Sequence, residues 1–480
     1  MRAYGAGAID MGERGSGGMN VTEQKDELGQ PGDVAGAGRF ERASHGTPRK
    51  SGDLDVPARD FAVSSAGVLD GEIVHVEAVE PAEPVEVEAV GPGDLTLAGA
   101  DVPLGAVTAE AYAEAFGEDM NATLNLDTWS TGFDLGALYE RLEKEVRDAV
   151  EQERRTRRQV RELVFPRLAE RPGAPASAGV YKVPLDRLEM CHKKVLFPGR
   201  VEACDGITVA HEGLSLDVVE VGVCLVSYRG DQGSWVHRLF RRDLRFRPAD
   251  AVQEAMTLLE RRFSGESDAV QRGLSDLARR GIMAFAERAI LVDRSRAEWR
   301  MGHGPVIPVE LLTGCGSPEF FERSLEYLLR LCLDHKKFVF VPSGGGMRFL
   351  NTIGDALAPM EYAIVDTAEG QIERILRSRR YPRKQRALLE DFAAQVGPAI
   401  VIGVYRVSRY SRSRVFYAPA SHPHEAALIA MADSSLQEHK GFPTLLDLAA
   451  NICRTTFASE VLLDSIRMAY LDAGEMTWPD

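Results

Sequence analysis

The order of strands and helices after residue 200 limits the possible folds more than any short motif does. Three apolar, strand-like segments follow one another at 200–204, 215–228 and 234–247, and only short polar connections join them. Short connections between consecutive strands predict an antiparallel meander. Helices and strands then alternate towards the end of the chain. This order predicts an α/β domain with a mixed sheet.

The alternation of helices and strands fills the C-terminal half. Helical periodicity marks the helices, and short apolar runs bounded by turn residues mark the strands. The expected helices are 250–263, 267–300, 318–335, 346–357, 383–396, 424–437 and 443–470. The expected strands are 304–314, 337–343, 361–366, 399–407 and 414–420.

The N-terminal part has a different composition. Residues 1–104 hold 19 acidic and 8 basic side chains, and Gly, Ala and Ser dominate the first 60. Such a segment cannot bury enough apolar surface to offset the entropy of ordering. We expect 1–105 to be a disordered or weakly structured acidic tail. A helical region at 106–179, with a long amphipathic helix and a linker, then leads into the main domain at 180–480.

Charge and cysteine content exclude several classes. The chain carries a net charge of −15, but 11 of those charges lie in the tail, so the rest is nearly neutral and not suited to coating DNA non-specifically. The six cysteines form no Cys-x-x-Cys pair, which excludes a zinc ribbon. The start of the chain lacks a basic segment followed by an apolar one, and no apolar run is long enough to span a bilayer. We therefore expect a cytoplasmic protein without a membrane partner.

Three acidic residues occupy suggestive places in this order. Asp205 ends the expected first strand, Glu287 lies on the helix before the fourth strand, and Glu310 interrupts the apolar segment 304–314. An RNase H-like fold has this element order and gathers acids from these positions to hold one or two Mg²⁺ or Mn²⁺ ions, which activate water and stabilise the attacked phosphate. Two of these acids also have a structural interpretation: Asp205-Gly206 as a hairpin turn, and Glu287 as a partner of a neighbouring arginine.

Two basic stretches suit nucleic acid. Residues 374–386 carry seven bases and no acid, and 405–417 interleave arginines with tyrosines. Arginines can pair with phosphates while tyrosines stack on bases. The alternative is a pair of strands with one charged face. The residues that we expect to bind DNA are Arg380, Arg383, Lys384, Arg406, Arg409 and Tyr410.

Over residues 190–475 the chain resembles the NurA-type nucleases. The resemblance rests on Asp205-Gly206, on the helix-borne Glu287 and on the C-terminal stretch "GFPTLLDLAANICRTTFASEVLLDSIRMAYLDAG". It implies an RNase H-like core, a homodimer and a Mn²⁺-dependent or Mg²⁺-dependent nuclease site. It also implies a HerA-like hexameric ATPase as the partner in DNA-end processing.

Three positions depart from the family pattern. The first motif is usually Asp-Gly-Ser, and here Ile207 follows the glycine. The fourth strand usually carries Asp-Gly, and here Glu310 precedes a leucine. The C-terminal stretch usually has His or Asp after its alanine, and here Ala450 follows, so Asp447 one helical turn earlier is the substitute ligand. These departures leave open a catalytically degenerate adaptor of the ATPase. A nuclease acting on RNA or hybrids is also open.

Overall fold

The computed structural model describes residues 107–130, 135–213, 216–241, 256, 273–344 and 348–475. All of them belong to one compact unit, Glu88–Asp480, and the other unit, Met1–Val87, lies outside the described residues. The expected tail at 1–105 also lies outside them. So do nearly all of the expected helix at 250–263 and the first turns of the one at 267–300.

A single nine-stranded mixed sheet organises the unit, in the order β1-β7-β8-β9-β6-β5-β2-β3-β4. One half holds β2 (Val201–Glu212), β3 (Asp217–Ser227), β4 (Gly230–Arg241), β5 (Trp299–His303) and β6 (Phe338–Val341). β2, β3 and β4 form an antiparallel meander, β5 pairs parallel with β2, and β6 pairs parallel with β5. This arrangement confirms the predicted meander followed by helix–strand alternation, and with it the RNase H-like order.

The other half of the sheet is antiparallel. It holds β1 (Gly179–Lys182), β7 (Glu361–Thr367), β8 (Ile400–Arg406) and β9 (Arg414–Pro419). β9 joins β6 and closes the two halves into one sheet. β1 pairs with β7 at the outer edge. The sequence did not predict β1.

Helices flank the sheet. The first group is α1 (Ala109–Phe116), α2 (Met120–Leu124), α3 (Gly136–Gln159), α4 (Leu185–Cys191), α7 (Ile282–Asp293), α8 (Val309–Thr313) and α9 (Pro318–Leu329). The second is α10 (Arg348–Ala356), α11 (Glu369–Ser378), α12 (Arg383–Val396), α13 (Pro423–Ser435), α14 (Thr444–Thr456) and α15 (Ser459–Asp472). Among the described residues, no helix is both long and apolar enough to cross a membrane.

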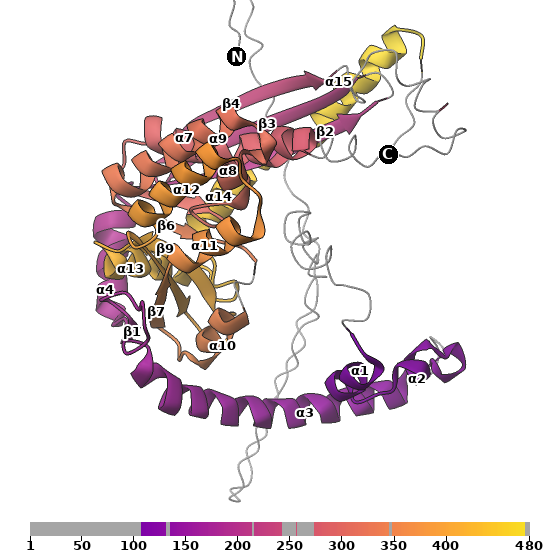
Figure 1. Ribbon diagram of the computed structural model, residues 1–480, viewed down its shortest axis with the longest axis vertical. Helices are drawn as coiled ribbons and strands as arrows, with labels where there is room; N and C mark the ends of the chain where they lie inside the picture. The colour runs from indigo at the N-terminus through magenta and orange to yellow at the C-terminus, as the bar shows by residue number, and fades with distance from the viewer. Residues whose placement is uncertain are drawn as a thin grey trace, which may run out of the picture. The chain divides into compact units, whose positions relative to one another are not determined.

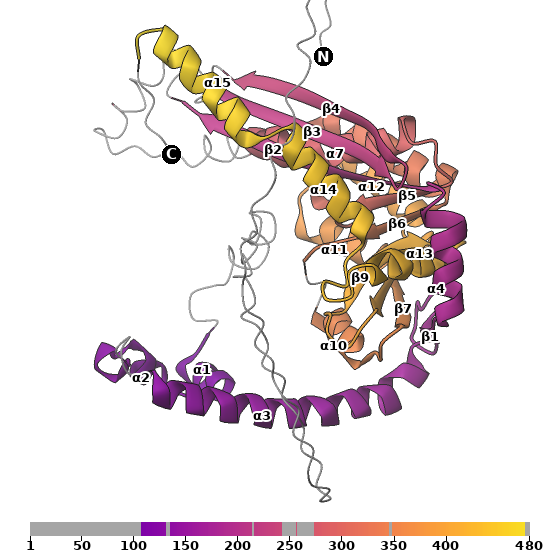
Figure 2. The same cartoon turned by 180° about the vertical axis from the view of Figure 1, so that it is seen from behind.

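The helices form a layer on each face of the sheet. α7, α9, α11 and α12 cover the face seen in Figure 1, and α4, α13 and α14 cover the opposite face, seen in Figure 2. Each face has its own core: Leu291 of α7 belongs to the larger cluster, and Leu445 of α14 to the other. Because strands in the middle are buried on both faces, they read as continuous apolar runs.

Several expected elements differ from the structure. Residues 304–314 do not form a strand: the fourth strand of the core is β5, and Glu310 lies in the first turn of α8. Gly304 has a φ of +77°, and Pro305 and Pro308 lack the N–H that a strand ladder needs. The expected helix at 443–470 is two helices, interrupted at Phe457.

The long amphipathic helix is present. α3 continues through a π-helical turn, Val160–Val164, towards the sheet. There Arg161 forms a bidentate ion pair with Glu361 of β7, at 2.6 and 3.1 Å. Most of the other arginines of the segment 154–161 pair with acids on the same helix.

Candidate active site

Asp205 lies inside β2, not at its tip. β2 continues to Glu212, and Asp205 and Gly206 lie opposite Cys224 and Val223 of β3. The interpretation of Asp205-Gly206 as a hairpin turn is therefore wrong, and so is the expected strand end at 204. What does end near Asp205 is the parallel ladder with β5, whose last pair joins Cys204 to Gly302.

Backbone and side-chain contacts fix the Asp205 carboxylate. Its Oδ1 accepts a hydrogen bond from the backbone N–H of Gly206 at 2.9 Å. The same oxygen lies 3.3 Å from Nδ1 of His303, the last residue of β5. The thiol of Cys453, on α14, donates to the Asp205 carbonyl at 3.2 Å. Asp205 is buried, so three elements hold it in place.

Glu287 reaches the same place from α7. A Cβ on Gly206 would lie only 3.0 Å from Glu287 Oε1, so the absence of a side chain at 206 leaves the room that this carboxylate occupies. Burial raises the pKa of Glu287 to about 7, and the Asp205 charge adds to the rise while Arg288 opposes it. The structure therefore brings together Asp205 and Glu287, two of the predicted site residues.

Arg288 is the ion-pair partner of Glu287. Its guanidinium also donates to the carbonyls of Ala284 at 3.2 Å, His303 at 3.2 Å and Pro305 at 2.6 Å, and lies 5.2 Å from the Phe340 ring centroid. Arg288 is buried. It links α7 to the end of β5 and neutralises Glu287 from within the protein.

His303 provides a second cation. Burial alone would lower the pKa of its imidazole, but Asp205 and then Glu287 raise it to about 9. At neutral pH His303 is therefore an imidazolium. Its side chain is 33% exposed, against 10% for the Asp205 side chain, so it joins the buried carboxylates to the surface.

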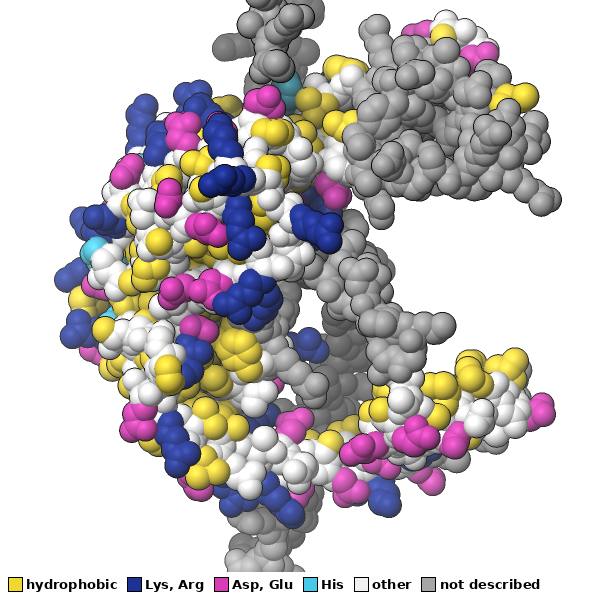
Figure 3. All heavy atoms as spheres, in the orientation of Figure 1, with side chains coloured by type: hydrophobic (Ala, Val, Ile, Leu, Met, Phe, Trp, Pro, Cys, Tyr) yellow, Lys and Arg dark blue, Asp and Glu magenta, His cyan; other side chains and the backbone are white. Residues whose placement is uncertain are grey.

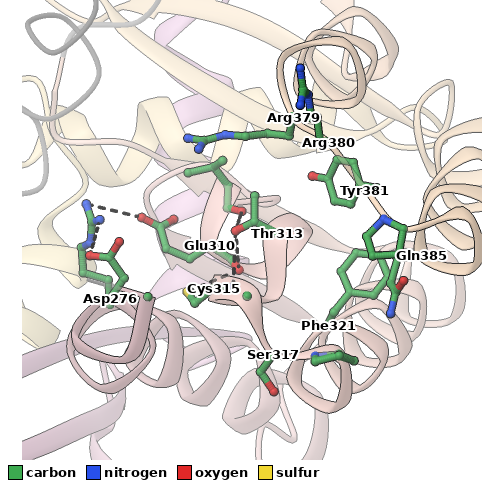
Figure 4. Close-up of a pocket in the computed structure, with 16 residues that line it drawn as sticks. Asp276, Glu310, Thr313, Cys315, Ser317, Phe321, Arg379, Arg380, Tyr381 and Gln385 are labelled. Carbon is green, nitrogen blue, oxygen red and sulfur yellow. Dashed lines mark hydrogen bonds and ion pairs between the residues drawn. The ribbon is translucent and has the colours of Figure 1, made fainter. Parts of the chain in front are cut away.

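The other two predicted metal ligands have different partners. Glu310 faces Arg280 at 3.8 Å in a pocket beside α8 (Figure 4). Asp447 lies in the first turn of α14 and pairs with Lys440 at 3.1 Å. In the described ranges, no three His, Cys, Asp or Glu side chains are placed to hold a metal ion. Asp205, Glu287, Glu310 and Asp447 thus do not converge.

The residues present do not fit a Mn²⁺ or Mg²⁺ ion in this arrangement. Such ions need several oxygen ligands converging on one point. Here two carboxylates meet, Arg288 lies against one of them, and His303 stands where the third acid was expected. The predicted metal centre is therefore not formed by these side chains as they lie.

The residues expected to bind DNA have varied surroundings. Arg406 donates to the carbonyls of Ser408, Asp355 and Arg409, so its guanidinium organises the loop after β8. Arg409 stacks on Tyr410 at 5.2 Å, and Tyr410 is exposed. Three more lie around the start of α12. There Lys384 pairs with Glu322 at 2.6 Å, Arg383 is exposed, and Arg380 lines the pocket that contains Glu310.

Sequence reasoning missed His303 and Arg288. Arg288 was weighed only as a partner of Glu287, and His303 was not considered, because the expected helix ran to residue 300 and hid β5. A signal was present: "WRMGHGP" follows the last helical residues and ends in Gly304-Pro305, a typical terminator.

Comparison with protein-family models and with curated proteins finds no match. Solved structures do match. The chain is similar to the NurA nuclease from Sulfolobus solfataricus at 9% identity and a TM-score of 0.37, over 72% of this chain and 99% of that one. A NurA structure with bound dAMP and manganese matches at 9% identity and a TM-score of 0.37, over 68% and 96% of the two chains. Both are nucleases of the family that the sequence resembles.

A third match has a different name. Endonuclease V from Ciona intestinalis, in complex with a 24mer DNA, matches at 8% identity and a TM-score of 0.23, over 54% of this chain and 85% of that one. At such similarities, any function has to be argued from the geometry of the centre itself.

Proposed function

We propose that the chain is a nuclease that hydrolyses phosphodiester bonds in DNA at the centre formed by Asp205, Glu287 and His303. One observation carries the proposal: two carboxylates from different elements, β2 and α7, lie buried together beside a partly exposed cation. Burying two acids together is costly unless they are used or neutralised. The similarity to NurA nucleases agrees with this proposal.

The side chains of the centre can supply acid–base chemistry. His303, a third exposed, attracts the phosphodiester and can give its proton to the leaving oxygen. Asp205 holds that imidazole in its protonated form and in one orientation. The Glu287 carboxylate can accept the proton of the attacking water. The new bond joins the water oxygen to phosphorus, and the bond to the leaving oxygen breaks.

Metal dependence is the part of the prediction that the geometry supports least. Mn²⁺ or Mg²⁺ was expected, but the donor set does not fit either ion as arranged. No step of the proposed chemistry uses a metal. The cleavage assay therefore compares Mn²⁺, Mg²⁺ and EDTA.

DNA in end processing is the proposed substrate. Exposed Arg383 and the stacked Arg409–Tyr410 pair remain candidates for phosphate and base contacts. A homodimer and a HerA-like hexameric ATPase belong to the same proposal. The apolar stripe of α3 offers a surface for such a contact, since Leu138, Leu142 and Val146 are each about half exposed in the single chain.

A second function is favoured by a specific observation. Arg288 and His303 each stand against one carboxylate of the centre. A centre that is neutralised in this way needs neither a metal nor a substrate to be stable. The chain would then be a catalytically silent adaptor of the ATPase.

Cleavage of end-labelled linear single- and double-stranded DNA, each with Mn²⁺, Mg²⁺ or EDTA, separates these functions. Asp205→Asn and Glu287→Gln should each lower the rate at least a hundredfold. Glu298→Gln, which changes a carboxylate outside the centre, should leave it unchanged. Cleavage that survives EDTA supports the acid–base centre. Cleavage lost in EDTA would mean that the side chains rearrange around a metal. No cleavage by the wild type, with or without a HerA-like ATPase, would leave the adaptor.

A further inference from the structure

A second candidate site is a pocket of about 700 Å³ on the face that α9 and α12 cover. It lies between α8, the start of α9, and the connection from α11 to α12 (Figure 4). Its volume is in the range of pockets that hold small organic ligands. None of its lining residues takes part in the Asp205 centre.

Two arginines give the pocket its positive side. Arg379 and Arg380 follow α11, line the pocket and are exposed. Within the described part of the chain, neither forms an ion pair or a side-chain hydrogen bond. The other bases nearby are engaged: Arg377 pairs with Glu373 at 2.6 Å, and Lys384 with Glu322 at the same distance. The two arginines therefore remain available for an anion.

Aromatic side chains and the N-terminus of α12 form another side of the pocket. The Tyr381 hydroxyl donates to the Leu312 carbonyl at 3.1 Å, which fixes the ring. Its centroid lies 6.3 Å from that of Phe321. Pro382 and Gln385, at the start of α12, complete this side, and no side chain caps that helix. Uncapped N–H groups add to the positive potential that the arginines create.

The opposite side is acidic. Figure 4 shows the carboxylates of Asp276 and Glu310 across the pocket from Tyr381 and Gln385. The Arg280 guanidinium forms ion pairs with both carboxylates, at 2.7 Å from Asp276 and 3.8 Å from Glu310. Carboxylate oxygens in this position can accept hydrogen bonds from amino or hydroxyl groups. The pocket thus presents two guanidinium groups, an aromatic ring and carboxylate acceptors to one cavity (Figure 4).

We propose that this pocket binds a nucleoside 5′-monophosphate group, either as a free nucleotide or as the phosphorylated end of a strand. The phosphate lies against Arg379 and Arg380, since paired guanidiniums match phosphate oxygens. The base lies against Tyr381, and its amino group or the sugar hydroxyl faces Glu310. Lys and Arg side chains alternate with Asp and Glu on the surface seen in Figure 3, so the positive charge of the site comes from the two arginines that line it.

The site does not require hydrolysis at the Asp205 centre. It is nevertheless connected to it, because Arg280 lies seven residues before Glu287 in consecutive helical segments, Leu277–Gly281 and α7. Seven helical residues span about 10 Å. A strand end held in the pocket would therefore lie within a few nucleotides of the centre.

Calorimetric titration of the full-length protein tests the proposal. The probes are dAMP, deoxyadenosine and inorganic phosphate, followed by a short single-stranded oligonucleotide with and without a 5′-phosphate. We expect dAMP to bind at least tenfold more tightly than deoxyadenosine or phosphate alone. The Arg379→Ala/Arg380→Ala double variant should weaken dAMP binding at least tenfold, and the matched control Arg377→Ala should not change it. Glu310→Gln should weaken dAMP but not phosphate.

The outcomes separate the two sources of the phosphate. Tighter binding of the 5′-phosphorylated strand than of dAMP identifies a strand end, and the reverse identifies a free nucleotide. The proposal is overturned if the wild type binds no dAMP, or if the double variant binds it as well as the wild type does. Both arginines are exposed, so circular dichroism should show an unchanged fold in that variant.

Discussion

At the scale of single residues, Gly206 shapes the Asp205 centre by having no side chain. A Cβ there would lie 3.0 Å from both Glu287 Oε1 and Met283 Cγ, and 3.3 Å from the Gly222 carbonyl oxygen. We predict that Gly206→Ala displaces Glu287 and destabilises the protein by about 1–3 kcal/mol. Urea denaturation measures the change. Gly370→Ala is the control, because its Cβ meets no atom within 4 Å, and it should be neutral or slightly stabilising.

Asp433 is a buried acid away from the proposed chemistry. Its carboxylate accepts hydrogen bonds from the Tyr228 hydroxyl and from the Leu445 N–H, the latter at 2.9 Å. Burial raises its pKa from 3.8 to about 7, and the charge of Asp447 adds to the rise. Between these values the folded protein holds a proton that the unfolded chain has released. The stabilisation is therefore full below about pH 4 and is lost as the pH rises to about 7.

We predict that Asp433→Asn removes this slope, because an amide does not titrate. The free energy of unfolding, measured by urea at pH 4 to 8, should fall with pH more steeply in the wild type than in the variant. The difference over the window should be a few kcal/mol, at about 1.4 kcal/mol per unit of pKa shift. Parallel curves for the two proteins would contradict the assignment.

The sequence placed Asp205 and Glu287 at one site, and the structure brings these two acids together, while their role in catalysis stays a prediction. Glu287 stands out because it interrupts an apolar run. Asp205 was singled out as the expected end of a strand, although that strand continues to Glu212. The sequence around His303 and Arg288 has no comparable signal, because the position of these two side chains depends on which strand lies beside β2. That neighbour is β5, about a hundred residues later in the chain, and pairing over such a separation leaves no local pattern.

At the scale of elements, the segment after β5 shows why one strand was misplaced. "GPVIPVELLTG" is apolar, and a short apolar run does not by itself distinguish a strand from a buried loop or helix. Its prolines decide the matter, because Pro308 starts α8 instead of continuing a ladder. Helices with strong periodicity, such as α9 and α12, were located within a few residues. The break between α14 and α15 was missed because both continue the same apolar pattern.

The attachment of α3 to the sheet is a property of this element that can be tested. Arg161 makes a bidentate pair with Glu361 and also donates to the Ala356 carbonyl at 3.1 Å. We predict that Arg161→Ala destabilises this attachment by about 1–2 kcal/mol, since the arginine is partly exposed and the pair is screened. Hydrogen exchange should then become faster in the segment 136–167. Arg155→Ala, which removes an exposed arginine paired with Glu151 of the same helix, should change it less.

At the scale of the whole unit, one sheet separates two cores. Leu291 lies in the core on one face and Leu445 in the core on the other, and both are fully buried. Because the same strands carry both cores, we expect them to unfold together. Leu291→Ala and Leu445→Ala should each cost about 2–5 kcal/mol and lower a single shared transition. Two transitions, of which each variant lowers only one, would show that the cores are independent.

The parallel pairing of β2 with β5 also sets the order in which a new chain can mature. The Asp205 carboxylate can contact His303 only after residue 303 has been synthesised. The Asp205 carbonyl can accept the hydrogen bond from the Cys453 thiol only after α14 has been synthesised. Contacts over such separations form slowly and late. A ribosome-bound or prematurely terminated product therefore carries the acids without their finished surroundings. Synthesis itself keeps the centre incomplete until almost the last helix of the chain has been made.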